Sequence, residues 1–128
     1  MRLLLDTHIL IWTLTDPARL QAWALTIVAE AKNTILFSAA SIWEIAIKSS
    51  LGKRGFEYEP KLIVDAARAA SFLEIPVTTT TALIAGSLPR IHRDPFDRML
   101  VAQAIDETAS LVTADQVLSG YSDFVAII

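Results

Sequence analysis

Four acidic residues occur where short apolar runs end or where helical patterns begin: Asp6, Glu44, Asp97 and Asp115. The carboxyl ends of strands in an open α/β sheet meet at one edge, so these side chains can converge there. Clustered carboxylates repel one another unless a cation lies among them. Oxygen ligands suit Mg²⁺ or Mn²⁺, which activate water and stabilise charge on a phosphodiester. If the carboxylates converge, the pattern predicts metal-assisted phosphoryl hydrolysis.

The aspartates also have a purely structural interpretation as helix caps. Asp94 precedes Pro95, which is a strong helix-start signal, and Asp97 then falls in the first turn, where the helix dipole favours a carboxylate. Asp6 can cap the helix that follows it, and Asp115 can serve as a turn or cap residue. We expect Asp94 to be a cap, and both interpretations stay open for the other three aspartates.

Glu44 has a local interpretation of its own. It follows Ser41 by three positions, as in the capping box, where the two side chains satisfy free backbone donors at a helix start. It also precedes Lys48 by four, which is a helix-stabilising spacing. Taken alone, these patterns favour a cap or surface role for Glu44 over a ligand role.

Short apolar runs alternate with helical patterns along the chain. Residues 3–5, 34–37, 75–78, 110–113 and 124–128 are expected to be strands. Helix starts are indicated at Thr7, Asp16 before Pro17, Ser41, Pro60 and Asp94 before Pro95. The alternation favours an α/β fold, a parallel sheet of about five strands covered on both faces by helices. Residues 1–128 are the size of a single domain.

Composition narrows the class of protein further. The chain has no cysteine and histidine only at His8 and His92, which argues against zinc and makes a reducing cytosol the expected compartment. A hydrophobic fraction of 53% suggests either a very full core or an apolar face that meets a partner, and we favour the partner face. The net charge of −3 lacks the overall basic footprint of a general nucleic-acid binder, although basic side chains cluster around residues 48–61 and 90–98.

The apolar start of the chain superficially looks like a secretory signal. Asp6 and His8 interrupt the run, and no small-residue cleavage site follows closely. We therefore expect mature structure there. No uninterrupted apolar run approaches the length of about 18 residues that a membrane span requires, so no membrane association is expected.

Four segments together resemble a PIN-domain ribonuclease of the VapC toxin family. They are LLLDTHILIW at 3–12, SIWEIAIK at 41–48, HRDPFDRMLVAQA at 92–104 and LVTAD at 111–115. The resemblance covers nearly the whole chain in the family's order. It implies a three-layer α/β/α sandwich and endonucleolytic RNA cleavage that depends on one or two Mg²⁺ or Mn²⁺ ions. It also implies a homodimer and inhibition by a cognate antitoxin.

The resemblance assigns roles by motif position. Asp6, Glu44, Asp97 and Asp115 would be the catalytic metal ligands. Thr113 and Thr7 would hydrogen-bond the carboxylates or a metal-bound water.

Three further residue types have less defined roles. Arg98 could neutralise the carboxylates or hold a phosphate, and a surface role is equally compatible with its position. His8 stands where many relatives have asparagine, so no catalytic role is assigned to it. The three tryptophans lie among apolar neighbours and are expected in the core. The helical segments 7–14 and 41–51 could supply apolar surfaces for the dimer and the antitoxin.

Two other functions remain compatible with the residues. One is phosphoryl transfer with Asp6 as the nucleophile, although no second aspartate lies next to it and no lysine follows a late strand. The other is a non-catalytic interaction module whose carboxylates only cap helices.

Overall fold

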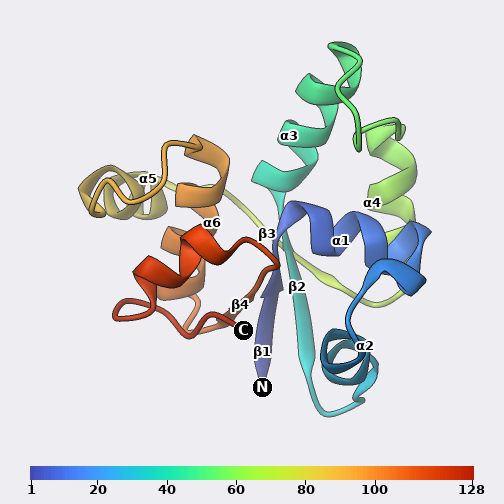
Figure 1. The fold of residues 1–128 in the computed structure, drawn as a ribbon, viewed down its shortest axis with the longest axis horizontal. Helices are drawn as coiled ribbons and strands as arrows, with labels where there is room; N and C mark the ends of the chain where they lie inside the picture. Colours follow the sequence, from blue (N-terminus) through green and yellow to red (C-terminus); the bar gives the residue numbers. More distant parts are fainter.

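Four short apolar runs form the sheet at the centre of the molecule. The computed structural model describes residues 1–128. The strands are β1 (Arg2–Leu5), β2 (Thr34–Ser38), β3 (Leu73–Ile75) and β4 (Ser110–Val112). All neighbouring pairs are parallel, in the order β3-β2-β1-β4 (Figure 1). The predicted parallel sheet is confirmed, with four strands instead of about five.

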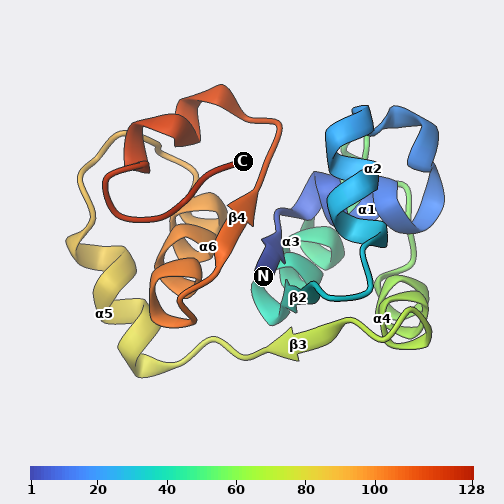
Figure 2. The same ribbon diagram turned by 90° about the horizontal axis from the view of Figure 1, so that it is seen from below.

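Helices connect the strands and cover both faces of the sheet. They are α1 (Thr7–Thr15), α2 (Ala22–Ala29), α3 (Ala39–Ser50), α4 (Pro60–Ala69), α5 (Thr79–Ser87) and α6 (Pro95–Asp106), with short 3₁₀ helices η1 (Pro17–Arg19) and η2 (Gln116–Tyr121). Figures 1 and 2 show α1, α2 and α4 on one side of the sheet and α5 and α6 on the other. None of these helices combines the length and apolar character that crossing a membrane requires.

The side chains of β1 show why the fold has three layers. Successive residues of a strand point to opposite faces. Leu3 and Leu5 belong to a buried cluster with residues of α1, α2 and α4, whereas Leu4 packs with Leu100 of α6 and Leu118 of η2. Because the strand buries apolar side chains on both faces, helices must cover both, and the predicted α/β/α sandwich is confirmed.

The predicted fifth strand, residues 124–128, is wrong. This segment runs beside β4 and makes a single isolated bridge between Leu111 and Ile127. Its backbone contacts include hydrogen bonds from Leu111 N to Ala126 O and from Thr113 N to Ile128 O. The chain turns at its start, where Phe124 is half exposed, so too few residues remain aligned with β4 to form a regular strand.

Two predicted boundaries shift for local reasons. The third strand is Leu73–Ile75 rather than 75–78, because Pro76 has no N–H for a ladder and Thr78 caps α5. The helix expected to begin at Asp16 is only the short η1, and α2 begins later, at Ala22.

The tryptophans depart from the predicted core positions. Trp43 is 64% exposed and Trp23 is 40% exposed, whereas Trp12 is partly buried against the core. Periodicity alone does not separate a core-facing aromatic side chain from one that lies on an apolar surface patch.

A buried polar chain holds α6 against the end of the sheet. Ser38 Oγ donates to Gln103 Oε1 at 2.6 Å, and Gln103 Nε2 donates to the carbonyl oxygen of Pro76 at 3.1 Å. Ser38 and Gln103 are buried, so breaking these hydrogen bonds would leave polar groups without partners. These hydrogen bonds therefore join the ends of β2 and β3 to α6, the helix that carries Asp97.

Candidate active site and metal centre

Asp6 is both a helix cap and a buried acidic group. It directly follows β1, and its Oδ1 accepts the N–H of Ile9 at 2.8 Å, so the capping interpretation, one of the two left open, is confirmed. Its other oxygen, Oδ2, accepts the hydroxyl of Thr113 at 2.5 Å. Thr113 directly follows β4, the neighbour of β1. The carboxyl ends of adjacent strands thus bring these two side chains together.

Glu44 does not form the predicted capping box. Helix α3 begins at Ala39, where β2 ends, and its cap is Ser38, whose Oγ accepts the N–H of Ala40. Glu44 therefore lies inside the helix and is only 3% exposed. Thr7 Oγ1 donates to Glu44 Oε1 at 2.6 Å.

Lys48 supplies a cation beside Glu44. Its Nζ lies 2.5 Å from Glu44 Oε2, which confirms the predicted i,i+4 pair, and 3.9 Å from Asp94 Oδ2. Burial lowers the pKa of Lys48, but the hydrogen bond to Glu44 and the nearby carboxylates outweigh burial and raise it. The ammonium group therefore stays charged among these acids.

Asp94 and Asp97 divide the two roles that the sequence left open at the start of α6. Asp94 Oδ1 accepts the N–H of Phe96 at 2.9 Å, so the predicted cap is confirmed. Asp97 lies one turn further along and points toward His92, whose Nε2 is 3.3 Å from Asp97 Oδ2. The cap and the inward-facing carboxylate are separate residues.

His92 joins Asp97 to Asp115. Its Nε2 also lies 3.0 Å from Asp115 Oδ2. The backbone N–H of Asp94 donates to His92 Nδ1 at 3.0 Å, which leaves the ring proton of the neutral imidazole on Nε2. His92 thus donates toward the two carboxylates and is not arranged to ligate a metal through Nε2. Asp115 also caps η2 through Val117, as one interpretation predicted.

The structure brings the four predicted acidic residues to one edge of the sheet, but only two of them, Asp97 and Asp115, lie in a tight group. Ligand atoms of His92, Asp97 and Asp115 all lie within 4.8 Å of one another. Asp6 and Glu44 are not part of this tight group. Asp6 connects to it through Thr113, whose Oγ1 donates to Asp6 and accepts the N–H of Asp115. Both Asp6 and Glu44 also act on Asp97 electrostatically.

Burial and like charges change the proton affinity of this edge. Burial, followed by the charges of Asp94 and Glu44, raises the pKa of Asp97 from 3.8 to about 7, while His92 opposes the change. Burial also raises the pKa of Asp6, against the hydrogen bond from Thr113. Negative charge is thus unfavourable here without a further cation. The carboxylate oxygens of Asp97 and Asp115 lie within 4.8 Å of each other at this edge, and oxygen ligands of this kind fit a hard divalent ion such as Mg²⁺ or Mn²⁺.

Sequence reasoning missed two residues of this edge. His92 was expected only as part of a basic cluster, and Lys48 only as part of another basic cluster and as the helix-stabilising partner of Glu44. His92 stands two positions before the cap Asp94, and that spacing lets the Asp94 N–H hold its ring. Side-chain to backbone contacts of this kind at helix starts are the signal that could have found it.

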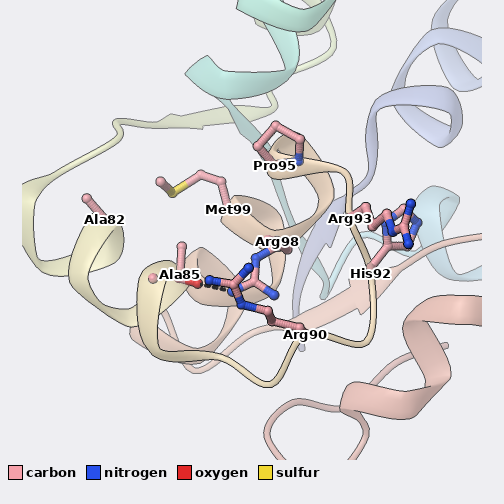
Figure 3. A pocket seen from close by; sticks show the side chains of 9 residues that line it. Ala82, Ala85, Arg90, His92, Arg93, Pro95, Arg98 and Met99 are labelled. Atoms are coloured by element: carbon pink, nitrogen blue, oxygen red, sulfur yellow. Dashed lines mark hydrogen bonds between the residues drawn. The ribbon is translucent and has the colours of Figure 1, made fainter.

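Arg98, predicted to neutralise the carboxylates or hold a phosphate, instead ties the loop before α6 to the helix. Its guanidinium donates to the carbonyl oxygens of Ala85, Leu88 and Pro89 and to the hydroxyl of Tyr121. The bond to Ala85 is drawn in Figure 3. The same Tyr121 hydroxyl accepts the N–H of His92. Arg98 therefore helps to position His92 rather than facing the carboxylates.

We expect Arg98→Met to destabilise the protein by about 3 kcal/mol, because three carbonyl groups lose a charged donor. The free energy of unfolding in urea measures this effect. Arg93→Met is the matched control, since Arg93 is exposed and makes no ion pair or hydrogen bond, and it should change stability by less than about 0.5 kcal/mol. Equal effects of the two substitutions would contradict the structural role of Arg98.

Comparison with known proteins identifies chains that share this fold. A comparison with curated protein sequences found no significant match. Among solved structures, a chain of VapBC2 from Rickettsia felis, bound to a promoter DNA fragment, aligns with TM-score 0.70 and 18% identity over 100% of this chain and 98% of that one. DNA-bound VapBC from Salmonella typhimurium gives TM-score 0.69 and 15% identity over 100% and 97%.

A third structure, VapBC-1 from nontypeable Haemophilus influenzae, aligns with TM-score 0.65 and 16% identity over 100% of this chain and 97% of that one. At these identities the three alignments establish a shared fold. The family model described as PIN domain matches residues 3–123, which include Asp6, Glu44, Asp97 and Asp115. The chain belongs to the PIN domain family.

Proposed function

We propose that this protein is a metal-dependent endoribonuclease and the toxin of a VapC-type toxin–antitoxin pair. The observation that carries the proposal is the acidic edge itself. Carboxylates that follow β1 and β4 and carboxylates of α3 and α6 meet there, and burial, together with the charges of Asp94, Glu44 and Asp6, raises the pKa of Asp97 to about 7. Asp97 and Glu44 cap no helix, and burying carboxylates beside other acids is unfavourable, which argues against a purely structural role.

Asp6, Glu44, Asp97 and Asp115 would hold one or two Mg²⁺ or Mn²⁺ ions. When bound, the metal supplies an activated water and offsets charge on the scissile phosphate. Thr113 and Thr7 orient the Asp6 and Glu44 carboxylates through hydrogen bonds of 2.5 and 2.6 Å. His92 orients Asp97 and Asp115 by donating toward both. No protein nucleophile is required, and both oxygens of Asp6 already accept hydrogen bonds, which disfavours an aspartyl-phosphate mechanism.

The partners in the proposal are RNA, an antitoxin and a second copy of the chain. VapBC complexes share the fold, which supports a protein partner here. Exposed apolar side chains supply surface for such contacts. Trp43 and Val77 are 64% and 46% exposed, and with Phe96 and Met99 they line an apolar hollow of about 390 Å³.

Removal of metal tests this proposal directly. We expect the purified protein to cleave a mixed RNA substrate with Mn²⁺, to stop in EDTA, and to recover when Mn²⁺ is restored. Single-stranded DNA of matched sequence serves as the substrate control. Calorimetry gives a second readout, because the carboxylates should bind Mn²⁺ without RNA. Cleavage that continues in EDTA, or a protein that binds no Mn²⁺, would contradict the proposal.

A further inference from the structure

A cleft of about 590 Å³ lies beside the acidic edge, between α5, α6 and the loop that joins them. Small side chains of α5, including Ala82 and Ala85, form one wall. Arg90 and Arg93 come from the loop and Arg98 from α6. Figure 3 shows Arg90 and Arg98 close together beside Ala85, with Arg93 next to His92.

The cleft has a positive charge that no carboxylate neutralises. Arg90, Arg93 and Arg98 take part in none of the ion pairs of the structure, although the chain as a whole has a net charge of −3. The donors of Arg98 are occupied by carbonyl oxygens and a tyrosine hydroxyl, so it contributes charge from a fixed position. Arg90 and Arg93 are exposed and free to bind. An exposed guanidinium group without an ion-pair partner can bind a phosphate through two parallel hydrogen bonds.

The cleft and the acidic edge share His92. This residue lines the cleft, and its Nε2 contacts Asp97 and Asp115. Asp97 and Arg98 are also consecutive on α6, with the carboxylate toward His92 and the guanidinium toward the α5 end of the loop. A nucleic-acid strand with one phosphate at the acidic edge can therefore place a neighbouring phosphate in the cleft.

We propose that this cleft binds a backbone phosphate of single-stranded RNA, adjacent to the phosphate that is cleaved, through Arg90 and Arg93. The inference rests on the proposed ribonuclease function and adds the path of the substrate. A polyanionic RNA strand is favoured over an acidic protein segment because the cleft is continuous with the reacting edge. Contacts to phosphate carry no base information, so the cleft should contribute equally for substrates of different sequence.

The test compares two double variants of the full-length protein. Arg90→Gln with Arg93→Gln removes the two free arginines of the cleft. Lys61→Gln with Arg68→Gln removes the same charge from α4, which lies on the opposite side of the sheet (Figure 2). Both control side chains are mostly exposed, at 79% and 64%. Circular dichroism establishes that all proteins are folded.

The readouts are KM, kcat and salt dependence with an oligoribonucleotide that the parent protein cuts at one place. The cleft variant should raise KM by roughly tenfold with kcat within twofold, while the control matches the parent. For the cleft variant, the slope of log(1/KM) against the logarithm of salt concentration should be shallower than for the parent. The difference should be about 0.7 for each phosphate that the variant no longer neutralises. Methylphosphonate linkages placed next to the cleavage site should raise KM for the parent and leave the cleft variant unaffected.

Each alternative outcome has a distinct meaning. If the parent does not cut RNA, both the proposed function and the cleft assignment fail. If the parent cuts and the cleft variant matches the α4 control, only the cleft assignment fails. A cleft variant that cuts RNA normally but no longer binds a co-expressed protein partner overturns the assignment in favour of a protein segment. A fall in kcat with unchanged KM also overturns it, because the arginines would then act at the reacting edge.

Discussion

An Asp97→Asn variant is expected to lose at least about 100-fold in RNA cleavage while remaining folded. Residues that only orient metal ligands typically cost 10–100-fold when changed, so a direct ligand should reach at least the upper end of that range. Asparagine has nearly the same shape as aspartate and can keep its amide oxygen beside His92 Nε2, which preserves the local geometry. Cleavage rates with saturating Mn²⁺ measure the loss.

Stability should move in the opposite direction from activity. Burial and the nearby carboxylates raise the pKa of Asp97 to about 7, so an ionised Asp97 is unfavourable at pH 8 without metal. A neutral amide removes that repulsion, and we expect metal-free Asp97→Asn to unfold at a higher temperature than the parent. This pairing of lost activity with gained stability separates a metal-binding residue from a helix cap, whose loss would lower stability.

Asp106→Asn is the matched control for this substitution. Asp106 lies at the other end of α6 and is exposed. The variant carries the same chemical change on the same helix, and its cleavage rate and stability should match those of the parent. An Asp97→Asn protein that cuts RNA at the parental rate would exclude Asp97 as a required ligand.

The second large effect is a fall in the free energy of unfolding of the metal-free protein as pH rises, which added metal should reverse. In the unfolded chain Asp97 loses its proton near its ordinary pKa of 3.8, whereas in the metal-free folded protein it keeps the proton up to about pH 7. The folded state therefore binds the extra proton between these values, and the free energy of unfolding falls as pH rises through this window. Asp6, whose pKa is also raised by burial, acts in the same direction.

The expected size of this effect is large for one side chain. At about 1.4 kcal/mol for each pKa unit, Asp97 alone accounts for about 4 kcal/mol between pH 4 and pH 8. Urea unfolding in EDTA across this range measures it. The difference in unfolding free energy between Asp97→Asn and the parent should grow with pH and level off above about pH 7. A constant difference would contradict the raised pKa.

Added Mn²⁺ should reverse the trend. Carboxylates must lose their protons to bind a metal, so binding is stronger at pH 8 than at pH 5. Stabilisation by a fixed Mn²⁺ concentration should therefore increase with pH in the parent and be much smaller in Asp97→Asn. Equal stabilisation of both proteins would place the metal away from Asp97.

Patterns within short stretches of the sequence identified much of the fold. The runs Leu3–Leu5 and 34–37 bury apolar side chains on both faces, which is typical of a central parallel strand, and both are strands here. Asp94 before Pro95 defined the start of α6 because capping depends on neighbouring backbone groups alone. Signals of this kind are local, so no knowledge of the rest of the molecule is needed to interpret them.

Long-range packing decided the features that local patterns left ambiguous. Ser38 and Ser41 can both cap a helix. Because β2 ends at Ser38, Ser38 caps α3, and Glu44 lies inside the helix as a buried residue instead of pairing with Ser41 as a cap. Residues 124–128 have strand-like composition, but their route back from η2 aligns only Ile127 with β4.

The residue types and their order determined by themselves that this chain forms an α/β sandwich with acidic residues at the strand ends. The tertiary structure decided how those residues are used. It turned Arg98 toward backbone carbonyl groups and placed His92 between Asp97 and Asp115, across more than twenty residues of sequence. The physical reason is that burial and charge repulsion depend on which side chains meet in space, and sequence spacing does not specify those distances.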